Sequence, residues 1–274
     1  MAKVMAEAIA AAKLPKAVTV TLKDKGETRT LEGMAHPELA TLIDCVSSLR
    51  AMGTVCNVWL TGPTGSGKTH GASQVAEAFK LRFYAQGACS MAYELTGFVD
   101  ASGTYHEMVF VTAYRNGGVI LLDEVDAFDN NALLALNAAL ANGQLELPNG
   151  ETIKRHPDCI ILGAANTYGL GATADYIGRA KLDAAFLNRF AVKIDWHYDD
   201  ALELAITGND AWALEVQKAR RNAHAAGLKV IVSPRHSQAG AALLAGGVAI
   251  SKVRKLTYLA GLTKEQANII SKDI

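Results

Sequence analysis

A glycine-rich segment carries the strongest chemical signal in the sequence. Residues 62–69 match the pattern GxxxxGK[ST] in full. Glycines let backbone N–H groups wrap around phosphate oxygens, and a helix that starts at such a loop adds the positive end of its dipole. Lys68 is expected to reach the β- and γ-phosphates and to act in catalysis, and the Thr69 hydroxyl to bind Mg²⁺. The predicted nucleotide-binding residues are Gly62, Pro63, Thr64, Gly65, Ser66, Gly67, Lys68, Thr69 and His70.

Two acidic residues follow an apolar run further along the chain. Asp123 and Glu124 come directly after the aliphatic residues 119–122. An acid at the carboxyl end of a buried parallel strand lies at the sheet edge where ligands bind. We therefore expect Asp123 to hold the metal together with Thr69, and Glu124 to orient and polarise the attacking water. For Asp126, capping of the next turn is the simpler interpretation.

A third polar residue stands at the tip of another apolar run. Asn166 follows residues 159–165, all of them apolar or small. An amide at this position can bind the γ-phosphate or the attacking water. Taken alone, an asparagine there is more often a turn residue.

Alternating strands and helices are expected to position these residues. Apolar runs predict strands at 57–60, 81–85, 118–122, 159–164 and 191–195, and helical spacing predicts helices at 37–52, 69–80, 108–115 and 131–141. Continuous apolar strands between helices indicate a parallel sheet covered on both faces, so the predicted fold class is α/β.

The pattern changes at both ends of this region. Helix formers at 4–13 and a possible hairpin over 17–31 predict an N-terminal extension at residues 1–35. Three helical segments after Tyr198, at 199–206, 210–226 and 234–245, predict a small helical domain. The expected organisation is an extension at 1–35, an α/β nucleotide-binding domain at 36–198 and a helical domain at 199–274.

Charge and composition restrict the function classes. The 274 residues include 27 Lys and Arg and 27 Asp and Glu, so the formal net charge is zero. This balance offers no global electrostatic reason to bind nucleic acid or an anionic membrane. No apolar run approaches the roughly 18–20 residues of a membrane span, and four scattered cysteines suit a reducing compartment. We expect a cytoplasmic protein with no membrane partner.

The order of five motifs resembles the AAA+ ATPase superfamily. They are the P-loop, Asp123-Glu124, Asn166, the segment 182–190 and Ser233-Pro234-Arg235. The sequence is most similar to the MoxR-like and dynein-related group, which includes the cobalt-chelatase ATPase subunit and the McrB restriction GTPase. The resemblance covers nearly all of residues 36–245, and it implies a P-loop NTPase fold with a C-terminal helical lid.

The resemblance also implies roles for single residues. Asn166 is similar to the sensor-1 residue, and Arg235 to the sensor-2 arginine of the lid. Arg189 looks like the arginine finger that reaches the nucleotide of a neighbouring subunit, with Arg179 as the second candidate. The alternative for each arginine is a surface salt bridge.

Two further segments resemble hairpins that line the central pore of ring-shaped relatives. They are residues 97–105 and residues 144–153, the latter with Asn149-Gly150 as a turn signal. Phe98 and Tyr105 would then contact the substrate. An ordinary hairpin with its aromatic residues packed on its own base is an equal alternative.

The resemblance implies a ring-forming, Mg²⁺-dependent ATPase that remodels a protein substrate or adaptor. The expected active form is a homo-oligomer of six subunits, and the expected cofactors are ATP and Mg²⁺. Two alternatives stay open: a McrB-like motor or loader that acts on DNA and could use GTP in place of ATP, and a slow nucleotide-gated assembly switch. A dinucleotide-binding dehydrogenase is excluded because the glycine spacing and Lys68 do not fit that fingerprint.

Overall fold

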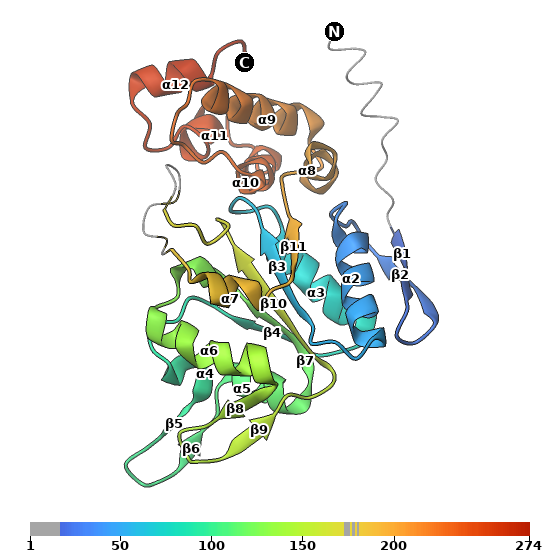
Figure 1. The fold of residues 1–274 in the computed structure, drawn as a ribbon. Coiled ribbons are helices and arrows are strands. Elements are labelled where there is room, and N and C mark those ends of the chain that lie inside the picture. Colours follow the sequence, from blue (N-terminus) through green and yellow to red (C-terminus); the bar gives the residue numbers. More distant parts are fainter. Residues whose placement is uncertain (1–16, 173–175, 177–178, 180) are drawn as a thin grey trace.

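The computed structural model describes residues 17–172, 176, 179 and 181–274. The helix predicted at 4–13 lies outside the described residues. Figure 1 shows a central sheet flanked by helices, with a group of helices at one end of it.

The central sheet has five parallel strands. In spatial order they are β11 (Val192–Asp195), β3 (Asn57–Thr61), β10 (Cys159–Ala165), β7 (Gly118–Leu122) and β4 (Phe83–Gln86). Every residue of β3, β7 and β10 is buried, and these strands are mostly apolar; the polar residues of β3 are Asn57 and Thr61 at its two ends. The predicted α/β fold with a parallel sheet is confirmed.

Helices cover both faces of the sheet, and successive strand residues point to opposite faces. Val58 and Leu60 join the hydrophobic cluster under α2 (Leu39–Ala51) and α3 (Lys68–Phe79). Trp59, between them, joins the opposite cluster. That second cluster lies under α4 (Tyr93–Thr96), α5 (Val109–Asn116), the 3₁₀ helix η1 (Val125–Ala127), α6 (Asn130–Asn142) and α7 (Ala184–Asn188).

The sheet brings the predicted chemical residues to one edge. The P-loop follows β3, Asp123 follows β7, and Asn166 follows β10, which lies between those two strands. In the register, Thr61 stands beside Ala165 and Leu122 beside Gly163. All three loops therefore leave the carboxyl edge of neighbouring strands, the edge that faces the C-terminal helices in Figure 1.

Three antiparallel hairpins extend from this framework. They are β1 (Ala17–Leu22) with β2 (Glu27–Glu32), β5 (Phe98–Val99) with β6 (Tyr105–His106), and β8 (Gln144–Glu146) with β9 (Thr152–Lys154). The hairpin predicted from Asn149-Gly150 is thus present. In Figure 1 the second and third hairpins lie at the end of the sheet domain away from the C-terminal helices.

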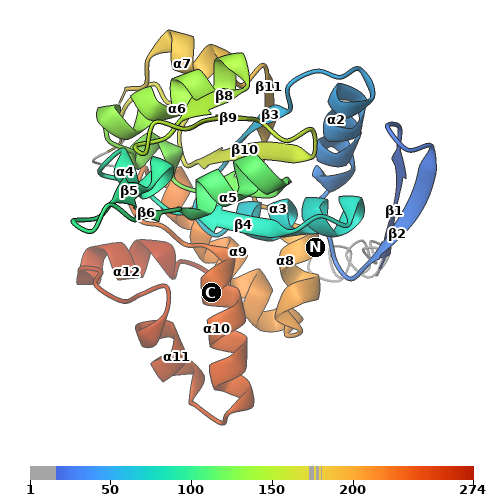
Figure 2. The same ribbon diagram turned by 90° about the horizontal axis from the view of Figure 1, so that it is seen from below.

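The C-terminal region is helical. It comprises α8 (Asp200–Thr207), α9 (Asp210–Ala225), α10 (Pro234–Ala245), α11 (Ile250–Leu256) and α12 (Lys264–Ile270). It has its own hydrophobic core around Trp212, Val216 and Val253. Figure 2, seen from below, shows these helices as a group on one side of the sheet domain. The expected C-terminal helical lid is confirmed as part of the fold, while the domain boundaries at 36 and 199 remain predictions.

A candidate nucleotide-binding site

The P-loop joins β3 to α3 in a conformation that its glycines permit. Gly67, at the N-cap of α3, has φ of +89°, a region that side chains other than glycine rarely adopt. Gly62 faces a close backbone neighbour, because a Cβ there would lie 2.0 Å from the carbonyl oxygen of Trp196. The loop therefore wraps tightly and presents the start of α3 to the pocket.

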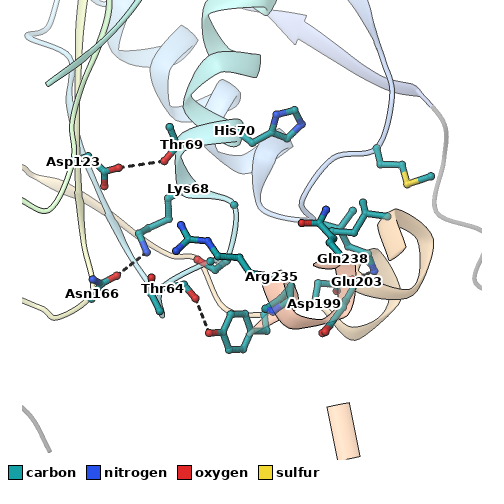
Figure 3. Close-up of a pocket in the computed structure, with 18 of the residues that line it drawn as sticks. Thr64, Lys68, Thr69, His70, Asp123, Asn166, Asp199, Glu203, Arg235 and Gln238 are labelled. Atoms are coloured by element: carbon teal, nitrogen blue, oxygen red, sulfur yellow. Dashed lines mark hydrogen bonds between the residues drawn. The ribbon is translucent and has the colours of Figure 1, made fainter. Parts of the chain in front are cut away.

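Lys68 is buried within the loop and is held by three oxygen acceptors. Its Nζ donates to the carbonyls of Gly62 at 2.6 Å and Pro63 at 3.0 Å, and to Asn166 Oδ1 at 3.2 Å. Burial lowers the pKa of the Lys68 ammonium to about 8, against the opposing charges of Asp123 and Asp126. The contact with Asn166, drawn in Figure 3, links the P-loop to the tip of β10.

Thr69 and Asp123 form a pair that suits Mg²⁺. Thr69 Oγ1 donates to Asp123 Oδ2 at 3.3 Å. Mg²⁺ prefers hard oxygen ligands and is commonly held by one or two carboxylates together with substrate phosphates. The buried hydroxyl of Ser66, in the P-loop, has no hydrogen-bond partner among the described residues, as expected of a loop shaped around a polar ligand. These residues fit a magnesium–nucleotide complex.

A pocket of about 470 Å³ collects most of the predicted residues. This volume lies within the range of small-molecule sites. Figure 3 shows side chains from the P-loop, the strand ends and the C-terminal helices converging on it. Its lining from the predicted set is Thr64, Gly65, Ser66, Gly67, Lys68, Thr69, His70, Asp123, Glu124, Asn166 and Arg235.

Arg235 reaches the pocket from the first turn of α10. Its side chain is exposed, and its Cγ would lie 3.4 Å from a Cβ built on Gly65. The helix begins with Ser233 and Pro234, a start signal that the sequence shows directly. Figure 3 shows the guanidinium directed toward the P-loop. The geometry is compatible with the role predicted for Arg235.

The two candidate finger arginines differ in their surroundings. Arg189 ends α7, its side chain is exposed, and it does not line the pocket. Arg179 is only 13% exposed and pairs with two carboxylates of its own chain. The geometry therefore favours Arg189 over Arg179 as a residue that reaches a neighbouring subunit.

Sequence reasoning missed two tyrosines that hold the P-loop. The hydroxyl of Tyr198 donates to the carbonyl of Thr64 at 2.7 Å, and the backbone N–H of Thr64 donates to Tyr176 Oη at 3.0 Å. Burial raises the pKa of Tyr198, which keeps its hydroxyl a donor. No local sequence pattern marks these tyrosines, because they come from distant segments.

Asp126 has a different role from the turn cap that the sequence suggests. Its carboxylate is fully buried, and Oδ2 accepts hydrogen bonds from the backbone N–H of Thr167 at 3.1 Å and the Thr167 hydroxyl at 2.8 Å. Its Oδ1 faces Arg179 Nη1 at 3.2 Å. Asp126 thus ties the segment after β7 to the tip of β10.

Trp196, which follows β11, packs against the P-loop and the first turn of α3. It is fully buried and stacks on His36, with ring centroids 4.3 Å apart. A Cβ on Gly71, in the first turns of α3, would lie 2.4 Å from Trp196 Cζ2. The indole can pack against α3 only because Gly71 has no side chain.

Replacement of Gly71 by Ala is therefore expected to destabilise the protein. Overpacking against a rigid indole costs about 1–3 kcal/mol, while alanine recovers about 1 kcal/mol of helix propensity over glycine. The free energy of unfolding in urea should fall, whereas Glu77→Ala, on the exposed face of the same helix, should leave it nearly unchanged. An equally stable Gly71→Ala protein would contradict the close contact with Trp196.

The stability of the protein is also expected to depend on pH through His36. Its Nε2 bonds the carbonyl of His197 at 2.8 Å, and its Nδ1 accepts from the backbone N–H of Glu38 at 3.1 Å. Both bonds fit the neutral ring, and burial lowers the pKa of His36 from its ordinary value of 6.5. The unfolded chain then binds more protons than the folded one, so stability is lost as pH falls below about 6.5.

Urea unfolding of wild type and His36→Gln at pH 7.5 and pH 5.5 checks this expectation. The wild-type protein should lose more free energy of unfolding than the variant on acidification, because the variant has no titrating group at this position. An equal loss in both proteins would assign the effect to other groups, such as His236, whose pKa burial also lowers.

The fold and the pocket together define a P-loop nucleotide-binding protein of the AAA+ class. Among solved structures, the fold is similar to that of a mutant RuvB of Thermotoga maritima, at a TM-score of 0.55 and 17% identity over 82% of this chain and 71% of that one. The RuvB Holliday junction branch migration motor of the same organism aligns at a TM-score of 0.52 and 16% identity. At these identities the likeness concerns the fold alone.

Sequence comparisons identify relatives with higher identity than these structures. An uncharacterized protein of Staphylococcus epidermidis is 32% identical over 165 residues, 55% of this chain and 59% of that protein. Midasin of Dictyostelium discoideum is 32% identical over 158 residues, which are 53% of this chain and 2% of midasin. The chain thus spans about three fifths of the length of the staphylococcal relative. Residues 57–190 match the family profile of the AAA domain, dynein-related subfamily.

Residues 57–190 therefore belong to the dynein-related AAA family, and the predicted membership of that group is confirmed. Membership of this family implies nucleotide binding and, in general, nucleotide hydrolysis. No helix among the described residues is long and apolar enough to cross a membrane.

Proposed function

We propose that this protein is a Mg²⁺-dependent ATPase that assembles as a ring and uses hydrolysis to remodel a protein partner. One observation supports the proposal: Lys68, Thr69, Asp123, Glu124, Asn166 and Arg235 line one pocket, whereas the side chain of Arg189 is exposed outside it. A homo-oligomer, with six subunits as the expected number, would bring the Arg189 of one copy to the pocket of the next.

Each side chain of the pocket has a chemical task in this proposal. The P-loop N–H groups and Lys68 bind the phosphates, and Lys68 exchanges its bonds to loop carbonyls for phosphate oxygens. Thr69 and Asp123 would hold Mg²⁺, which neutralises phosphate charge when bound. Glu124 orients the attacking water, Asn166 binds the γ-phosphate or that water, and Arg235 adds positive charge from the lid.

Other residues of the pocket lining suit a nucleobase. Met34, Leu202 and Ile206 supply apolar surface, and Gln238 supplies a polar group. We propose ATP as the nucleotide. GTP is the alternative, because the sequence also resembles the McrB restriction GTPase. Competition between ATP and GTP for a fluorescent nucleotide would separate them.

The proposed partner is a protein that contacts the β5–β6 hairpin. Phe98 is 37% exposed and stacks on His106, with ring centroids 4.9 Å apart. Tyr105 instead donates its hydroxyl to the carbonyl of Thr96 at 2.6 Å and packs on the core. Phe98 is therefore the better contact residue of the two. A nucleic-acid partner is not favoured, because the net charge is zero. The proposed location is the cytoplasm.

The mass of the Glu124→Gln protein, measured by light scattering with and without Mg-ATP, tests ring formation. The variant should hold nucleotide without consuming it, so growth to a particle of about six subunits is expected. A particle that stays monomeric with bound ATP would contradict the ring and the role of Arg189.

A further inference from the structure

A chain of polar contacts leads from the tip of β10 to the Glu124 carboxylate. Thr167 donates twice to Asp126, Asp126 faces Arg179, and Arg179 in turn faces Glu124. Arg179 Nη2 lies 3.4 Å from Glu124 Oε1 and Nη1 lies 3.5 Å from Oε2. Both carboxylate oxygens of Glu124 thus face one planar guanidinium.

The anchor of this chain is Asp126. Its side chain is 0% exposed, and a buried carboxylate needs donors and a counter-charge to stay in the fold. Thr167 supplies two donors and Arg179 the counter-charge. Arg179 is therefore held firmly on the Asp126 side, where breaking the pair would strand a buried charge.

Glu124 has little else to fix its orientation. Its side chain is 49% exposed, and its backbone is left-handed, with φ of +54°. Such a conformation is unfavourable in a residue other than glycine and persists only where its surroundings hold it. Among the described residues, Arg179 is the partner of the Glu124 carboxylate. A guanidinium that faces both oxygens fixes the plane of a carboxylate, which a single-point cation cannot do.

We propose that Arg179 is a positioning residue for hydrolysis: anchored on buried Asp126, it fixes the plane of the Glu124 carboxylate and couples it to the strand end that carries Asn166. This inference rests on the proposed ATPase activity. It differs from the role of a finger, because the contacts of Arg179 lie within its own chain.

The consequence is a link between two parts of the site. Asn166 binds Lys68, and its neighbour Thr167 binds Asp126. A shift of the β10 tip on phosphate binding would therefore move the anchor of Arg179, and with it Glu124. The orientation of the Glu124 carboxylate thus depends on the tip of β10, which also contacts Lys68 through Asn166.

The test compares Arg179→Gln, Arg179→Lys, Asp126→Asn and the double variant Arg179→Gln/Asp126→Asn. Wild type and Glu124→Gln are assayed first, and absence of wild-type hydrolysis would overturn the proposed function itself. With hydrolysis established, Arg179→Gln should lower kcat by up to about 10²-fold, the cost of about 1 Å misplacement. The Kd for a non-hydrolysable fluorescent ATP analogue should stay within about twofold of wild type.

Three further outcomes separate positioning from other roles. Arg179→Lys should recover part of kcat, and the double variant should be no slower than the slower single variant, because both changes break one link. Arg82→Gln, a change at an exposed arginine that does not line the pocket, should keep wild-type kcat. Should Asp126→Asn fail to fold, the two Arg179 variants still decide.

The proposal is overturned if Arg179→Gln keeps or raises kcat, or if it loses nucleotide affinity in step with activity. It is also overturned if Arg179→Gln subunits mixed into wild type inactivate more than their share of sites. That last result would show that Arg179 acts on a neighbouring subunit.

Discussion

Replacement of Glu124 by Gln is expected to lower ATP turnover by about 10²–10⁴-fold, the range of a lost general base. Affinity for the nucleotide should stay close to that of wild type, because Lys68, Thr69 and Asp123 are untouched. The amide has nearly the same shape as the carboxylate but cannot take a proton from the attacking water. Phosphate release measures turnover, and a fluorescent nucleotide titration measures affinity.

Glu77→Gln provides a matched control for this change. Glu77 is an exposed carboxylate on α3, so its amide variant should keep the wild-type rate. Unchanged turnover in Glu124→Gln would remove Glu124 from the catalytic set. A loss of nucleotide affinity in the variant would instead show that the backbone around Glu124, which is left-handed, had rearranged.

Replacement of Arg189 by Ala should leave nucleotide binding intact and lower turnover by about 10³–10⁵-fold, the contribution of an arginine finger to phosphoryl transfer. The physical reason is position: the side chain is exposed and does not line the pocket of its own chain. The backbone carbonyl of Arg189 accepts from Asn57 Nδ2 at 3.0 Å, and this bond survives the substitution. The fold around α7 should therefore be retained.

Mixing experiments then determine whether Arg189 acts across an interface. Arg189→Ala subunits added to wild type should inactivate neighbouring sites, so that activity falls faster than the wild-type fraction. Arg82→Ala is the control, since its side chain is exposed and takes no part in the site. A mixture that behaves as the sum of its parts would refute action in trans.

Much of the fold could be predicted because its signals are local. Apolar runs marked the three central strands β3, β7 and β10, since a strand buried on both faces is apolar at most positions. The bounds predicted for α10 agree with Pro234–Ala245, because a serine N-cap and a proline at N1 mark the start. Helices α11 and α12 were not predicted, because seven residues show little periodicity and depend on packing around Val253 and Ile270.

The same distinction holds for the candidate site. The residue types and spacing of the P-loop, Asp123, Glu124 and Asn166 by themselves determined which side chains would meet, since parallel strands end at one edge. Their catalytic roles remain predictions.

Only the tertiary structure decided the partners that come from distant segments. It placed Tyr198 on the P-loop, buried Asp126 under Thr167, and separated the exposed Arg189 from the engaged Arg179. Thr167 and Asp126 are 41 residues apart in sequence. Contacts between residues so far apart in sequence depend on the paths of the loops and on which buried charges need a partner. A local sequence pattern contains neither kind of information.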